Sequence, residues 1–324
     1  MQARHRSGRR GDRPSFSIED LGLLAKLPLL KASSHILREK DWPKLCRLLA
    51  RASSPPASTE SAIRSYFGNC RQEEIDPRSV AVDVGAARVE QYMQTLRARR
   101  TGGRSPWAPA TRLTGLDGLR RALEDGRGAV LWVAHFAFAP LAAKAAFADA
   151  GYRIWHMSRP EHGFSKTRFG VAVLNPLRSQ AEEQFLAGRI IIDRDKPAAA
   201  PLRAARLLSE NAVVSITAGA WEGSRVLEAP FGPGVVEIAN GAPALAHLSG
   251  AQLFPVVALR PAPGAPIDVM VLEPLAADRS VGRSAWVAAA THEFAARVDP
   301  FVRRHPDQWR DWSRWRLFPG EADA

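Results

Sequence analysis

The 324-residue chain has ordinary globular composition, with 46% hydrophobic and 24% charged residues. These proportions exclude disordered, collagen-like and disulfide-stapled proteins, and the presence of only two cysteines favours a reducing compartment. The net charge of +12 predicts attraction to anionic partners such as phosphates, lipid headgroups or acidic carrier proteins.

A strongly basic segment opens the chain. Residues 1–14 carry five arginines and almost no apolar side chains, which predicts a disordered arm that attracts anions without sequence choice. Residues 15–324 are expected to form a single domain, with a helical section over 15–110 and an α/β core over 111–324. No stretch has the roughly 20 consecutive apolar residues that a membrane-spanning helix needs. We therefore expect a cytoplasmic protein, held at most peripherally on the membrane.

Apolar residues recur at helical spacing in the N-terminal section. Helices are expected over about 17–36, over 41–52, from Glu60 onward and over about 84–100. The amphipathic stretch Leu21–Leu30, together with the basic arm, predicts contact with an anionic membrane surface. Ordinary packing of this helix against the core is the alternative.

Helix and strand alternate from residue 116 onward. Short apolar runs predict strands at 129–134, 152–157, 190–192, 213–217 and 253–259. Amphipathic stretches predict helices at 116–124, 141–150, 198–209 and 242–249. This order predicts an α/β fold with a mostly parallel central sheet flanked by helices.

Polar side chains follow several of the predicted strands, where parallel sheets bind their ligands. They are His135, then Arg159 and Glu161, then Asp193 and Arg194, then Glu222 and Arg225. The pattern predicts a cationic pocket around one imidazole. There His135 can accept a proton from a hydroxyl nucleophile, and the arginines can bind phosphate or a developing oxyanion.

Simpler interpretations remain open. A histidine beside a strand is often only a hydrogen-bonded structural residue, and Asp193 with Asp195 can cap the helix at 198–209. No metal site and no bound cofactor are predicted, because the other histidines lack metal-type spacing and have no cysteine nearby. These histidines are His156, His162, His247 and His292. Aromatic and basic residues do not interleave, so specific nucleic-acid binding is not predicted.

The order of these segments resembles the bacterial lipid A biosynthesis acyltransferase family. The strand that ends in His135-Phe136 is similar to the family's catalytic segment, and Ser158-Arg159-Pro160 resembles its Arg-Pro motif. Pro230-Phe231-Gly232 resembles its Phe-Gly loop, and residues 303–315, from Arg303-Arg304-His305-Pro306 to Trp315, are close to its C-terminal signature. The likeness extends over roughly residues 20–318.

This resemblance implies transfer of an acyl chain from acyl carrier protein or coenzyme A to a hydroxyl of a phosphorylated glycolipid. It implies that His135 deprotonates the acceptor hydroxyl, and that Arg159 and Arg194 bind phosphate. The expected location is the cytoplasmic face of the inner membrane.

Two departures from the family pattern concern the acid partner of the histidine. The family has a carboxylate five residues after its histidine, where this chain has Pro140, and Glu222 lies about one position out of register. One hypothesis is an active acyltransferase in which Glu161, Asp193 or Glu222 replaces the lost acid. The other is an inactive relative that binds acyl chains, carrier protein or lipid as partner of another enzyme.

Overall fold

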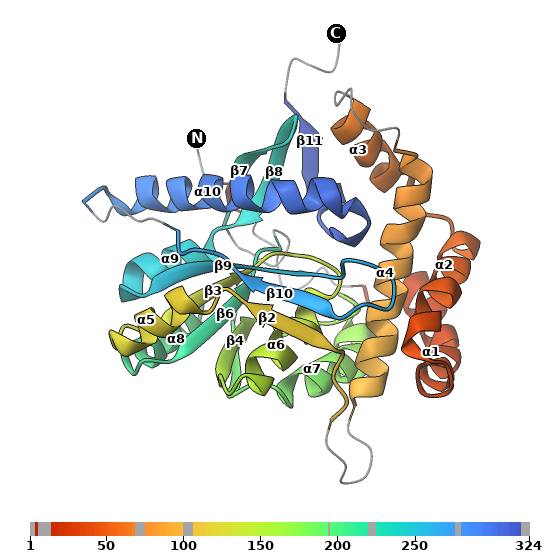
Figure 1. Cartoon of the computed structure of the whole chain (residues 1–324), viewed down its shortest axis with the longest axis horizontal. Coiled ribbons are helices and arrows are strands. Elements are labelled where there is room, and N and C mark those ends of the chain that lie inside the picture. The colour runs from red at the N-terminus through yellow and green to blue at the C-terminus, as the bar shows by residue number, and fades with distance from the viewer. Residues whose placement is uncertain are drawn as a thin grey trace.

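A seven-stranded sheet forms the centre of the molecule (Figure 1), in the order β2-β10-β9-β3-β6-β4-β5. The computed structural model describes residues 4–5, 14–68, 75–99, 106–193, 195–219, 225–275 and 280–318. The strands are β2 (Thr111–Thr114), β3 (Ala129–Val133), β4 (Ile154–Ser158), β5 (Gly188–Ile191), β6 (Val213–Thr217), β9 (Gln252–Leu259) and β10 (Ile267–Val271). β9, β3, β6, β4 and β5 are parallel, whereas β10 and β2 run antiparallel to them at one edge.

Helices cover both faces of this sheet, and β3 shows why. All five residues of β3 are buried, as its unbroken apolar sequence requires. On one face lie α6 (Ala139–Asp149), which packs on β2, β4, β9 and β10, and α7 (Asn175–Glu183), which follows the π-helix η2 (Gly170–Leu174) and packs on α6. The other face carries α5 (Asp117–Glu124), α8 (Ala199–Ser209), α9 (Gly241–Ser249) and α10 (Arg283–Arg304). The predicted α/β class with a mostly parallel sheet and flanking helices is confirmed.

A second, four-stranded antiparallel sheet stands beside α10, in the order β1-β7-β8-β11. It is built on the hairpin of β7 (Arg225–Phe231) and β8 (Gly234–Ala239), with β11 (Trp315–Leu317) on one side and β1 (Arg4–His5) on the other. Gly232 turns the hairpin with φ of +55°, and a Cβ there would meet the Tyr66 ring at 2.5 Å. Most of the predicted disordered arm lies outside the described residues.

The helical section packs around one long helix, α4 (Pro77–Ala98), which contacts all three other α-helices of that section. These are α1 (Ile18–Ile36), α2 (Trp42–Ala52) and α3 (Ala57–Gly68), with the short 3-10 helix η1 (Glu39–Asp41) between the first two. Ser17 caps α1 by accepting the Asp20 N–H at 3.1 Å, while the Asp20 carboxylate accepts the Ser17 N–H at 3.0 Å.

Within the described ranges, none of these helices combines the length and the apolar character that a bilayer crossing requires.

α4 also contacts α7 and the C-terminal 3-10 helix η4 (Pro306–Gln308), which is followed by a second 3-10 helix, η5 (Trp312–Arg314). The helical section therefore reaches the carboxyl end of β3, where the polar residues gather.

Candidate active site

The C-terminal segment runs beside the loop that follows β3. The Arg310 N–H donates to the His135 carbonyl at 3.1 Å, and the Ala137 N–H donates to the Gln308 carbonyl at 2.8 Å. Phe136 and Trp309 form an antiparallel bridge between these hydrogen bonds. A short two-stranded pairing thus brings residues 308–311 to His135 across the length of the α/β core.

This pairing places a carboxylate on the imidazole. Nδ1 of His135 lies 2.8 Å from Oδ1 of Asp311, and the two side chains are 13% and 9% exposed. A carboxylate accepts a hydrogen bond, so Nδ1 carries a hydrogen, and in the neutral imidazole Nε2 keeps a lone pair. The arrangement is that of a base held in one tautomer by an acid.

Aromatic packing fixes the segment that carries Asp311. Trp309 stacks on Phe231 at 5.0 Å between ring centroids, and Trp312 packs edge-on against Tyr66 at 5.4 Å. The Trp312 indole N–H also donates to the Pro306 carbonyl at 3.0 Å. Because these rings are buried on either side of Asp311, its carboxylate has little freedom to leave the imidazole.

The carboxylate on Nδ1 of His135 belongs to none of the three acids that the sequence suggested. Asp193 is exposed beyond β5, and its carboxylate accepts the N–H of Asp195 at 3.0 Å. It does not cap α8, whose N-cap makes no side-chain hydrogen bond. Glu161 is buried in the loop after β4, with its carbonyl accepting from Asn175. Glu222 lies outside the described residues.

The predicted arginines are placed differently from one another. Arg159 is half-buried directly after β4, at the carboxyl edge of the sheet as expected. Arg225 is exposed at the start of β7, in the second sheet, and Arg194 lies outside the described residues. The sequence interpretation missed Arg310, whose backbone touches His135. Its only signal was its place beside Asp311 in the C-terminal signature.

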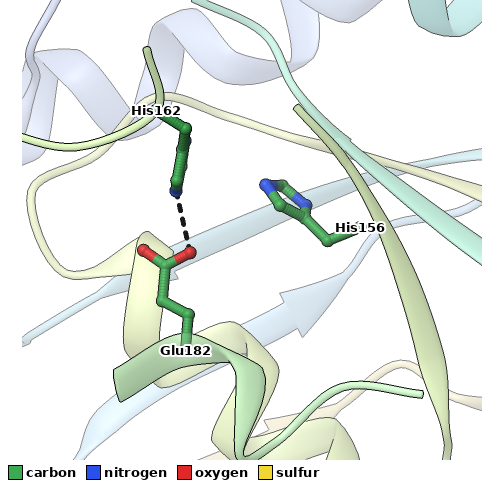
Figure 2. A group of neighbouring side chains, drawn as sticks. All are labelled: His156, His162 and Glu182. Atoms are coloured by element: carbon green, nitrogen blue, oxygen red, sulfur yellow. Dashed lines mark hydrogen bonds and ion pairs between the residues drawn. The ribbon is translucent and has the colours of Figure 1, made fainter. Parts of the chain in front are cut away.

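A second polar cluster is buried between β4, the loop after it and α7 (Figure 2). The His162 Nε2–H donates to Oε2 of Glu182 at 2.8 Å, and the His156 ring points toward this pair. Nδ1 of His156 is 2.9 Å from the hydroxyl of Ser215, whereas its Nε2 has no hydrogen-bond partner in the described part of the chain. One potential ligand atom from each of the three residues lies within 4.8 Å of the others, a metal-binding geometry that sequence spacing did not predict.

The charges around Glu182 argue against a metal ion there. Lys144 Nζ lies 2.9 Å from Oε2, and Arg178 Nε lies 2.7 Å from Oε1. Burial by itself raises the pKa of Glu182, but His162, Lys144 and Arg178 hold it well below its ordinary value. Because two cations already neutralise this carboxylate, a metal would have to displace Lys144. The cluster is a buried ion network.

A small cavity of about 10 Å³ adjoins this network, between α6 and the sheet. Its polar lining comes from Lys144, His156, Ser215 and Thr217, and it has room for about one water molecule. Pro140 also lines it, and the carbonyl of Pro140 accepts a hydrogen bond from Lys144 Nζ at 2.7 Å. A proline is tolerated there because the second residue of a helix needs no N–H donor.

Comparison with known proteins adds no identification. No protein-family model matches the chain, and no curated protein matches it significantly.

Proposed function

We propose that this protein is an acyltransferase of the lipid A biosynthesis type, with His135 as general base and Asp311 as its orienting acid. The observation that carries the proposal is the 2.8 Å contact between His135 Nδ1 and Asp311 Oδ1 at the carboxyl end of β3. The order of the sequence motifs supports the family, and the mostly parallel sheet is compatible with it. The acyl donor is an acyl carrier protein or coenzyme A thioester, and the acceptor is a hydroxyl of a phosphorylated glycolipid.

In the proposed reaction His135 acts first as a general base and then as a general acid. Nε2 of His135 takes the proton of the acceptor hydroxyl, and the oxygen attacks the thioester carbonyl. The tetrahedral intermediate collapses with cleavage of the carbon–sulfur bond, and the imidazolium returns the proton to the thiolate. The Asp311 carboxylate stabilises the imidazolium between these steps, as the acid of a serine protease triad does. The products are the acyl ester and a free thiol.

The alternative from the sequence is an inactive relative that binds acyl chains, carrier protein or lipid. Its main support was the loss of the acid at position 140. Asp311 removes that support, because a carboxylate contacts the imidazole from another part of the chain. The binding-only hypothesis now predicts that the protein binds these ligands without turnover.

We also propose that the protein binds the cytoplasmic face of an anionic membrane through α1. Ile18, Leu21, Leu29 and Ile36 recur every three to eight residues along one side of this helix and are all exposed. Leu23 and Leu30 face the opposite side and are buried. An exposed apolar stripe on a protein of net charge +12 suits a surface that is both apolar and anionic.

The activity test uses purified protein with long-chain acyl-CoA or acyl carrier protein thioesters and phosphorylated glycolipid or lysophospholipid acceptors. Mass spectrometry detects the acyl ester, and a thiol reagent detects the released thiol. We expect wild type to form both, and His135→Ala to form neither. His35→Ala, at an exposed position of α1, is the control and should retain turnover. Full turnover by His135→Ala, or none by wild type with every pair, would contradict the proposal.

A further inference from the structure

Arg310 is a half-buried cation beside the proposed active site, and no carboxylate of the described residues pairs with it. Its backbone N–H donates to the carbonyl of His135, while its guanidinium Nη1 donates to the neutral amide oxygen of Gln91 on α4. Among the described residues it forms no ion pair. Guanidinium groups removed from water are normally paired with a carboxylate or another anion. The positive charge of Arg310 is therefore not neutralised by an ion pair within the described part of the chain.

Two more guanidinium groups come from α4, which Arg310 contacts through Gln91, and from α7, which packs against α4. Arg88 is on α4 one turn before Gln91, and its Nε donates to the Tyr92 hydroxyl at 3.0 Å. Arg178 comes from α7 and binds Glu182. Burial, followed by repulsion from Arg88 and Arg178, lowers the pKa of Arg310 to about 10. Arg310 of the C-terminal segment is therefore repelled by positive charges from α4 and α7.

The nearby acids do not balance these charges. Glu182 already contacts His162, Lys144 and Arg178. Asp311 is hydrogen-bonded to His135, and although its charge raises the pKa of Arg310, that pKa stays below its ordinary value. Tyr92, and more weakly Glu19 of α1, raise the pKa of Arg88, but Arg88 forms no ion pair among the described residues. Arg88 is exposed and Arg310 is half-buried. The local excess of positive charge favours an anion with several acceptor oxygens.

We propose that Arg310 and Arg88 together bind a phosphate group and hold it beside His135. For the identity of the ligand the proposal rests on the acyltransferase function, since a phosphorylated acceptor or the phosphates of a thioester donor supply the same chemistry. A phosphate anchored at Arg310 lies next to the segment that carries Asp311. Binding there orients the reacting group toward Nε2 of His135. The anion site comes from α4 and the C-terminal segment, apart from the predicted Arg159, Arg194 and Arg225.

The first experiment measures binding of inorganic pyrophosphate by calorimetry. We expect wild type to bind it, with affinity that falls as salt is raised. Arg88→Gln should weaken binding roughly 10- to 100-fold, the loss expected for one charge-assisted hydrogen bond. Arg88 is exposed, so this variant keeps the fold. Arg78→Gln, which removes an exposed arginine from the same helix, is the control and should bind as wild type does. Equal affinity of the two variants, or no binding by wild type, overturns the proposal.

A second experiment identifies the source of the phosphate and separates this proposal from the acyltransferase function. Turnover is compared for acceptors with and without phosphate, and for acyl-CoA against acyl-pantetheine, which lacks the nucleotide phosphates. Arg88→Gln should raise KM for whichever phosphorylated substrate uses the site, and leave KM for its phosphate-free counterpart unchanged. Unchanged KM for every substrate overturns the phosphate site while transfer itself stands. Loss of pyrophosphate binding in Arg88→Gln, without transfer by wild type, supports the anion site and contradicts the acyltransferase.

Discussion

At the scale of single residues, the proposed site depends on a contact between distant parts of the chain. His135 lies two residues after the buried strand β3, so the sequence places it near the carboxyl end of a sheet. Asp311 is 176 residues away, and its contact depends on the pairing of residues 308–310 with 135–137. The candidate acids named from the sequence were those that follow predicted strands, and Asp311 follows none of these strands. Its one signal was its position between buried tryptophans in the C-terminal signature.

The buried cluster of His156, His162 and Glu182 was missed for a similar reason. His156 is on a strand, His162 in a loop and Glu182 on a helix, so their sequence spacing has none of the regularity of a metal motif. Only the packing of α7 beside the sheet brings the three together. Lys144 and Arg178, the two cations that neutralise Glu182, also come from different helices. Such a network is determined by tertiary packing and is not visible in a local pattern.

We expect His156 to make the stability of the protein sensitive to acid. Burial, followed by Lys144 and His162, holds its pKa well below the ordinary value. The unfolded chain binds a proton at this histidine below about pH 6.5, but the folded protein does not, so stability falls as the pH falls through that value. The slope from this one group reaches about 1.4 kcal/mol per pH unit.

Chemical denaturation of wild type and His156→Gln at several values between pH 7.5 and 5 measures this effect. Glutamine keeps a hydrogen-bonding group for Ser215 and does not titrate, so the free energy of unfolding of the variant should fall less steeply over that interval. Parallel curves for the two proteins would show that another group causes the acid sensitivity.

At the scale of elements, short apolar runs identified the central strands well. The predicted strands at 129–134, 213–217 and 253–259 correspond closely to β3, β6 and β9. The hairpin of β7 and β8 was missed, because its residues were interpreted only as a loop of the family resemblance. The predicted fourth helix was too short, since α4 begins at Pro77, where Asp76 caps it. Short amphipathic strands and helix starts carry weaker signals than buried strands.

The exposed stripe of α1 makes a prediction for membrane binding. Replacing Leu29, which is 52% exposed, by Ser removes apolar surface from the stripe without changing charge. Because burying a leucine contributes about 1.5–3 kcal/mol, partition into anionic vesicles should weaken roughly tenfold or more. Sedimentation with vesicles that contain an anionic phospholipid measures this partition.

The matched control for this substitution is Leu202→Ser on α8, where the leucine is 63% exposed on a different element. It should leave vesicle binding unchanged, and high salt should weaken binding of all variants by screening their positive charge. Equal losses for the two leucines would indicate nonspecific adhesion, and no loss for Leu29→Ser would exclude α1 as the membrane contact.

At the scale of the whole molecule, the C-terminal segment joins the helical section to the sheet. The side-chain amide of Gln308 donates to the Arg260 carbonyl just after β9, while Arg310 contacts Gln91 of α4. The same segment supplies Asp311 to His135. The proposed active site is therefore assembled from the two ends of the α/β core together with α4, and it forms only when the chain has folded as a unit.

The most direct test of this account is the turnover of Asp311→Asn. The substitution preserves shape but removes the charge that orients His135, and the corresponding change in a serine protease lowers kcat about 10⁴-fold. Asp307→Asn, in the same C-terminal segment, is the matched control, since burial already raises the pKa of that carboxyl and the neutral amide suits its site. We predict a loss on the order of 10³- to 10⁴-fold for Asp311→Asn and nearly full turnover for Asp307→Asn. Equal turnover of the two variants would contradict the pairing of His135 with Asp311 as the basis of catalysis.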